Sequence, residues 1–111
     1  MARRGFLGGF ELLVLLALIR LDEEAYGVPI SEAIEESSGR DVALGSVYIT
    51  LGRLERKGLV SSKLGEPTAA RGGRAKTYFR ITPQGLRDVR QAQRTLVKLW
   101  DGVPQLHGGA A

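Results

Sequence analysis

Two short segments with alternating apolar residues limit what this chain can fold into. They are LVSSKLG (59–65) and KTYFRIT (76–82), and a glycine-containing loop (66–75) joins them. Alternation over this length with such a connection predicts two β-strands that pair as a hairpin. Phe79 and Ile81 can supply apolar side chains to one face of the hairpin, so a helical body is needed to cover that face.

Three segments before the hairpin have helical periodicity. Residues 10–21 are apolar on nearly all sides, which predicts an enclosed core helix. Residues 27–38 have an apolar face opposite a glutamate face, and Gly39 is expected to cap their end. From residue 45 the apolar positions again have helical spacing, and Gly58 is expected to end that helix.

A fourth helix is expected after the hairpin. Thr82 and Pro83 suit the N-cap and the first helical position, and the helix is expected to run to Asp101. Its apolar residues form one continuous stripe, which can pack wholly on its own domain or partly on the same helix of a second subunit. The length of the stripe and Trp100 favour the second arrangement.

The order of these elements predicts a mainly α, α+β fold. Three helices followed by a two-stranded hairpin form a winged helix-turn-helix, in which the third helix enters the DNA major groove. The expected divisions are a flexible N-terminus (1–8), a winged-helix DNA-binding domain (9–82), a C-terminal dimerisation helix (83–101) and a disordered tail (102–111).

Charge is distributed unevenly along the chain. The net charge is +4 overall, but residues 53–80 hold eight Lys/Arg against two Asp/Glu, whereas residues 1–52 hold four against eight. A concentration of positive charge of this kind is typical of a face that binds nucleic acid. A merely solvated face is the alternative.

The composition argues against several other functions. The chain has no cysteine, and its one histidine, His107, lies in the glycine-rich tail, so neither a thiolate nor a histidine metal site is expected. No group of residues suggests catalysis, and no cofactor is expected. The apolar run from Leu12 to Ile19 is far shorter than the about 20 residues that cross a membrane, so neither export nor membrane insertion is expected and the cytoplasm is the default location.

Three side chains of the third helix are expected to contact DNA. Ser46 and Thr50 are adaptable donors and acceptors, and Arg53 can bind guanine through two hydrogen bonds. In the alternative, Ser46 only caps the helix and Arg53 only pairs with Glu55 or Glu36.

The loop of the hairpin carries the densest positive charge. Arg71, Arg74 and Lys76 are placed to neutralise phosphates, and the glycines at 72 and 73 let the backbone follow the duplex closely. An arginine at the tip could instead enter a narrow minor groove. Of Tyr78 and Phe79, one is expected to face the core.

The apolar residues of the first and last helices are expected to form a dimer interface. The set is Leu12, Leu16, Leu86, Val89, Leu96, Leu99 and Trp100. A twofold dimer matches a palindromic DNA site with half-sites about one helical turn apart.

The motifs AYGVPISEAIE, GSVYITLGRLERKGLV and RGGRAKTYFRITPQG, in this order, resemble the PadR family of bacterial transcriptional regulators. The resemblance covers about residues 7–101 and implies a homodimeric winged-helix protein, usually a repressor, in the short form with one C-terminal helix. By similarity the DNA contacts are Ser46, Tyr48, Thr50, Arg53, Arg71, Gly73, Arg74 and Lys76. A small aromatic or drug-like effector is implied between the subunits, lined by Leu12, Val89, Leu96 and Trp100.

Two positions depart from the family pattern. Ala43 and Leu44 stand where many relatives have Ser and Pro, so the usual capping hydroxyl is missing and Ser46 either replaces it or contacts DNA. Ile49 stands where many relatives have Pro. If it is exposed it could contact a thymine methyl group, and if it packs inward the outward face of this helix is a different one.

Together these features predict a cytoplasmic, homodimeric, sequence-specific DNA-binding regulator that is not an enzyme. The expected partners are double-stranded DNA, a second copy of the chain and a small effector, with no membrane. The alternatives are a winged helix that binds a protein partner and a sensor that captures a small molecule with little sequence-specific DNA binding.

Overall fold

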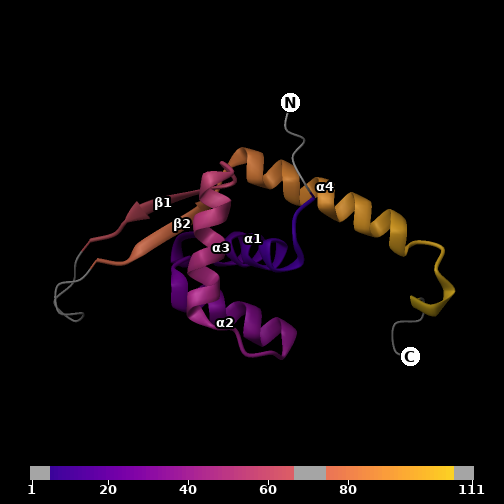
Figure 1. Ribbon diagram of the computed structural model, residues 1–111, viewed down its shortest axis with the longest axis horizontal. Helices are drawn as coiled ribbons and strands as arrows, with labels where there is room; N and C mark the ends of the chain where they lie inside the picture. The colour runs from indigo at the N-terminus through magenta and orange to yellow at the C-terminus, as the bar shows by residue number, and fades with distance from the viewer. Residues whose placement is uncertain (1–5, 67–74, 107–111) are drawn as a thin grey trace.

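The computed structural model describes residues 6–66 and 75–106. It has a helical body with a two-stranded wing on one side and a long helix that leaves on the other (Figure 1). The elements are α1 (Gly9–Leu21), η1 (Asp22–Glu24), α2 (Gly27–Ser38), α3 (Leu44–Arg56), β1 (Val60–Leu64), β2 (Thr77–Ile81), α4 (Pro83–Trp100) and η3 (Pro104–Leu106). The predicted mainly helical winged-helix arrangement is confirmed.

The core lies where α1, α2 and α3 pack together beneath the start of the hairpin. α3 crosses in front of α1 in Figure 1, and both helices pack against α2. The largest fully buried side chains of the core are Val14, Leu15, Ile30, Val47, Leu51, Leu54 and Leu59. Burial of this one apolar cluster provides the main driving force for folding.

One side of α1 remains uncovered. Leu13 and Leu16 are each 41% exposed and Ile19 is 39% exposed. The prediction of an enclosed helix is therefore wrong for a single chain, because α2, α3, β2 and α4 together cover only part of the apolar circumference of α1. An uncovered apolar ridge of this kind is typical of a surface that contacts a partner.

The two strands pair antiparallel, from Val60 opposite Ile81 to Leu64 opposite Thr77. Phe79 is buried, and its backbone N–H donates to the carbonyl oxygen of Ala25, just before α2, at 2.8 Å. This hydrogen bond joins the outer edge of β2 to the helical body. On β1, the side chains of Ser61 to Leu64 are exposed.

The predicted helix ends are confirmed at two places. Gly39 caps α2 in the left-handed conformation (φ 72°), which glycine adopts without a steric penalty. Thr82 caps α4, where its Oγ1 accepts a hydrogen bond from the Gly85 N–H at 3.0 Å and donates one to the Gly58 carbonyl oxygen at 2.7 Å. The threonine thus joins the end of α3 to the start of α4.

The ends of the described chain differ from the expected flexible N-terminus and disordered tail. Leu7 is only 9% exposed and belongs to the core cluster. Pro104–Leu106 form a single 3₁₀ turn after α4. Residues 1–5 and 107–111 of those two expected segments lie outside the described residues.

A test of this packing is the substitution Gly85→Ala. A Cβ there would collide with the Leu59 carbonyl oxygen and lie 2.6 Å from Ile81 Cγ1. We expect a loss of about 1–3 kcal/mol in the free energy of unfolding, because α4 must move away from the hairpin. Urea denaturation measures this loss. The control is Gly9→Ala, where a Cβ meets nothing within 4 Å, and equal stability of the two variants would contradict the prediction.

Candidate nucleic-acid interface

The side of α3 that faces away from the core carries one exposed apolar residue among polar ones. Ser46, Arg53 and Arg56 are exposed, and Ile49 is 64% exposed. The sequence placed Arg56 at the end of this face, but it was not predicted among the DNA contacts. The sequence signal that could have identified Arg56 is its spacing of seven residues from Ile49, which puts both residues on one side of a helix.

Thr50 does not lie on this face. Its exposure is 4%, and it stands three residues after Val47 and four before Leu54, both fully buried. The prediction that Thr50 faces outward is therefore wrong. The helical period places its short side chain with the inner apolar residues, where it fits without a large steric demand.

No hydroxyl group caps the start of α3. The N-cap is Ala43, which makes no side-chain capping hydrogen bond, and the Ser46 backbone N–H donates to the Ala43 carbonyl oxygen at 3.0 Å. Ser46 is exposed one turn into the helix. Ser46 therefore does not replace the missing cap.

Tyr48 has a packing role as well as an exposed edge. Its ring lies tilted against Phe79, with centroids 6.4 Å apart, and a Cβ on Gly27 would lie 2.5 Å from its Cζ. The missing side chain at Gly27 therefore lets α3 approach the first residue of α2. Tyr48 remains 45% exposed.

A buried carboxylate joins the end of α3 to the start of α1. Glu11 is 6% exposed, and its Oε2 accepts a hydrogen bond from Lys57 Nζ at 2.8 Å. Its Oε1 accepts from the Gly8 N–H at 2.9 Å. Burial alone would raise the pKa of Glu11, but the Lys57 hydrogen bond, the Gly8 N–H and the charges of Lys57 and Arg53 together hold this pKa below its ordinary value.

The surroundings of Arg53 differ from the ion pairs considered from the sequence. Glu55 accepts a hydrogen bond from Ser62 Oγ at 2.7 Å, while the Arg53 charge acts on Glu11. Within the described ranges, no ion pair forms between Arg53 and either Glu55 or Glu36. The guanidinium group is therefore exposed at the edge of the α3 face.

The base of the wing is held by aromatic contacts. Lys76 Nζ lies 4.0 Å from the centre of the Tyr26 ring, and this ring meets Tyr78 edge to face with centroids 5.4 Å apart. Tyr78 is half-buried and Phe79 is buried, as the strand alternation requires. The other predicted wing contacts, Arg71, Gly73 and Arg74, lie outside the described residues.

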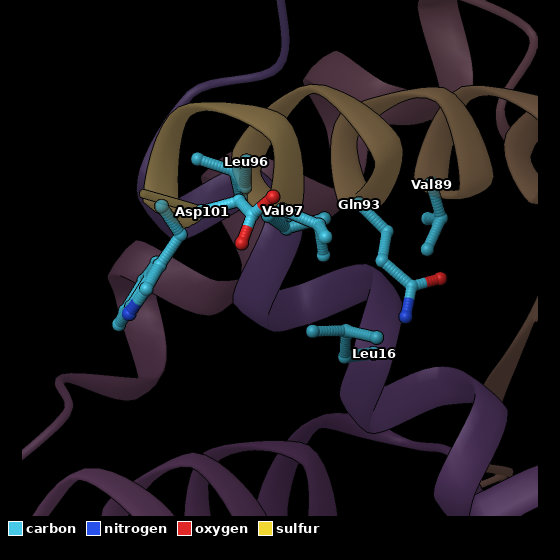
Figure 2. Close-up of a pocket in the computed structure, with 8 residues that line it drawn as sticks. Leu16, Val89, Gln93, Leu96, Val97 and Asp101 are labelled. Atoms are coloured by element: carbon cyan, nitrogen blue, oxygen red, sulfur yellow. The ribbon is translucent and has the colours of Figure 1, made fainter. Parts of the chain in front are cut away.

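A separate apolar groove runs between α1 and α4. Val89, Gln93 and Val97 of α4 point toward Leu16 of α1 (Figure 2). The groove has a volume of about 550 Å³, and its full lining is Leu12, Leu16, Val89, Gln93, Leu96, Val97, Trp100 and Asp101. All four residues expected to line an effector pocket are therefore in it.

The groove departs from the predicted dimer set in two directions. Leu86 and Leu99 do not line it, and Leu99 is 70% exposed on another side of α4. Gln93, Val97 and Asp101 line it but were missed from the sequence. The available signal was that they follow Val89 at successive steps of four residues along the helix, but two of the three are polar and did not extend an apolar stripe.

The described ranges hold no group of three or more His, Cys, Asp or Glu side chains arranged to bind a metal ion. Nor does this part of the chain contain a helix with the length and apolar character needed to cross a bilayer.

Comparison with known proteins agrees with this geometry. The model of the transcriptional regulator PadR-like family matches residues 15–91. A PadR family regulator from Eggerthella lenta DSM 2243 is 30% identical, with a TM-score of 0.67 over 87% of this chain and 82% of that one. A PadR-like regulator from Bacillus cereus is 23% identical, with a TM-score of 0.71 over 90% and 92%. No curated protein sequence matches the chain.

The family match spans most of the chain and includes α2, α3, the hairpin and the start of α4. The chain therefore belongs to the PadR-like family of transcriptional regulators, a family of DNA-binding proteins. In helix-turn-helix proteins the recognition helix lies in the DNA major groove, and α3 occupies the corresponding place in this fold.

The Glu11–Lys57 ion pair yields a test based on pH. We expect Glu11→Gln to lower the free energy of unfolding at pH 7 by about 1–2 kcal/mol, because a charge-assisted hydrogen bond is removed. The loss is limited to this range because water partly screens the charge of Lys57. The folded-state pKa of Glu11 lies below that of the unfolded chain. Its contribution is therefore complete above about pH 4.5 and disappears as the pH falls through the folded-state pKa.

Chemical denaturation of both proteins at pH 7 and pH 3 measures this difference. The gap between wild type and Glu11→Gln should narrow at the lower pH. A gap that stays constant across this range would show that the carboxylate charge contributes nothing to stability.

Proposed function

We propose that this protein is a cytoplasmic, homodimeric repressor that binds a palindromic operator through α3 and the wing. The observation that carries the proposal is the outward face of α3. This face carries exposed Ser46, Arg53 and Arg56 and no acidic side chain among them. The opposite side of the helix is buried. Arginine and serine at such positions suit base edges and phosphates.

The wing supports the same function through charge. The segment 53–80 contains eight Lys/Arg and two Asp/Glu, and most of these cations follow α3 in the chain. Arg71, Gly73, Arg74 and Lys76 are proposed to contact the phosphate backbone beside the groove that α3 enters. Lys76 would do so from its place above the Tyr26 ring.

The groove between α1 and α4 supports a dimer. Leu96 is 39% exposed, Val97 58% and Trp100 55%, and the uncovered ridge of α1 adjoins them through Leu16. A second copy that covers these side chains would remove a continuous apolar surface from water. The twofold symmetry of such a dimer matches an inverted-repeat operator.

The same groove favours a second role as an effector site. Its walls are mainly apolar, with Gln93 and Asp101 as polar groups. This composition suits a flat, largely apolar molecule with one or two hydrogen-bonding groups. Binding of such an effector between the subunits would change the spacing of the two α3 helices and relieve repression.

Capture of sheared genomic DNA by the purified protein at about 150 mM salt, followed by sequencing, tests the function. Non-specific contacts are strongly weakened at this ionic strength. We expect a few enriched fragments that share an inverted repeat. Uniform recovery would overturn sequence-specific regulation and favour a protein-interaction role.

The wing contribution is tested by replacing Arg71 and Arg74 with Ala. We expect weaker binding to every duplex and a flatter dependence of log K on log salt, by about 0.9 for each phosphate that is no longer neutralised. The control is Arg90→Ala with Arg94→Ala, which removes the same charge from the exposed side of α4. Fluorescence anisotropy at several salt concentrations measures both slopes, and equal slopes in the two variants would exclude the wing from the interface.

The dimer is tested by Leu96→Glu. A carboxylate in the apolar groove would be desolvated without a partner in the dimer, so we expect monomers in analytical ultracentrifugation. Leu64→Glu is the control, because Leu64 is 68% exposed on β1 and does not line the groove. A Leu96→Glu variant that sediments as a dimer would place the interface elsewhere.

A further inference from the structure

Ile49 is an apolar side chain placed at the centre of a surface otherwise suited to DNA. At 64% exposure it is among the most exposed large apolar residues of the body, and none of the described elements covers it. Gly45 lies four residues before it and Gly52 three residues after it. These spacings put both glycines on the same side of α3 as Ile49. Ile49 therefore has bare helix backbone on the flank formed by Gly45 and Gly52, and Ser46 and Arg53 on its other flank.

The fold itself does not require these two glycines. A Cβ on Gly45 would meet nothing within 4 Å, and a Cβ on Gly52 would only touch Arg56 Nη1 at 3.8 Å, an ordinary contact. Gly27 and Gly85 are different, because a side chain there would collide with neighbouring atoms of the same chain. Glycine in a helix is less stable than alanine. The bare strip thus weakens α3 without improving the packing of the monomer.

A bare strip of backbone beside an exposed apolar side chain suits close approach to a partner surface. In the major groove, the apolar group on a base edge is the C5-methyl group of thymine. The major groove admits an α-helix, and a helix without side chains at positions 45 and 52 can lie deeper in it on that flank. Arg53 and Arg56 then remain at the edge of the same face, where guanine or phosphate can be reached.

We propose that Ile49 is a specificity-determining residue that contacts a thymine methyl group in each operator half-site, and that Gly45 and Gly52 provide the clearance for this contact. This inference rests on the proposed DNA-binding function. It assigns an A·T base pair to the centre of the half-site beneath α3. Ile49 selects it through an apolar contact rather than a hydrogen bond.

The test removes one methyl group at a time from the DNA. The operator recovered by the genomic selection is synthesised with each thymidine replaced in turn by deoxyuridine, which lacks only the C5-methyl group. We expect one or two positions in each half-site at which wild-type affinity falls about fourfold, the value of one buried methyl-sized group. At those positions Ile49→Ala should bind thymidine and deoxyuridine duplexes equally, and Ile49→Val should keep most of the difference.

The clearance is tested with Gly52→Ala. We expect this variant to melt at the same or a slightly higher temperature than wild type, because alanine favours the helix. Its affinity for the operator should nevertheless fall about tenfold, because the added methyl group holds α3 away from the base edges. Gly9→Ala is the matched control in another helix with equal room for a Cβ, and it should leave operator affinity unchanged.

The outcomes separate this inference from the function on which it rests. If the selection returns no specific duplex, both are overturned. If an operator is found but no deoxyuridine substitution weakens wild-type binding, DNA recognition stands and the role of Ile49 is overturned. The same holds if deoxyuridine substitution weakens the binding of Ile49→Ala as much as that of wild type. Unchanged operator affinity in Gly52→Ala would overturn the proposed clearance.

Discussion

The direction in which α3 faces depends on the burial of its inner side. Val47, Leu51 and Leu54 are fully buried against α1 and α2, and a rotation of the helix by one residue would bring at least one of them into water. Apolar burial, rather than any property of the outer side chains, thus decides that Ile49 and the two arginines point outward. Substitutions on the outer side can therefore alter recognition at little cost to the fold.

Much of the architecture could be predicted from local signals in the sequence. Helical periodicity, Gly39 as a cap and the Thr82–Pro83 pair indicated the helices, and alternation indicated the hairpin. Thr50 was misplaced because a short β-branched polar residue fits either side of a helix, so its type does not reveal its burial.

The Glu11–Lys57 pair joins residues 46 positions apart and depends on how α1 crosses α3. Local patterns do not contain that crossing geometry. Of the candidate site, exposed cations were predictable, whereas the clearance at Gly45 and Gly52 required coordinates.

The two proposed functional surfaces share α1. Its first turn holds the end of α3 through Glu11, and the next turn lines the groove through Leu12 and Leu16. In the proposed dimer, the helix that contacts the partner subunit is thus the helix that supports the end of α3. A displacement of α1 by a ligand in the groove would act directly on the ion pair at Lys57. In this proposal, α1 alone connects the effector site to α3.

The hairpin also has a consequence for how the protein behaves at high concentration. A two-stranded sheet has two edges with unpaired backbone groups, and each can accept a strand from another molecule. The edge of β2 is joined to the helical body through the Phe79–Ala25 hydrogen bond. The edge of β1 carries exposed Ser61, Ser62 and Lys63, and a charged side chain on an edge strand opposes the addition of another. Both edges of the wing are therefore guarded, which opposes association of crowded copies of the chain through their sheets.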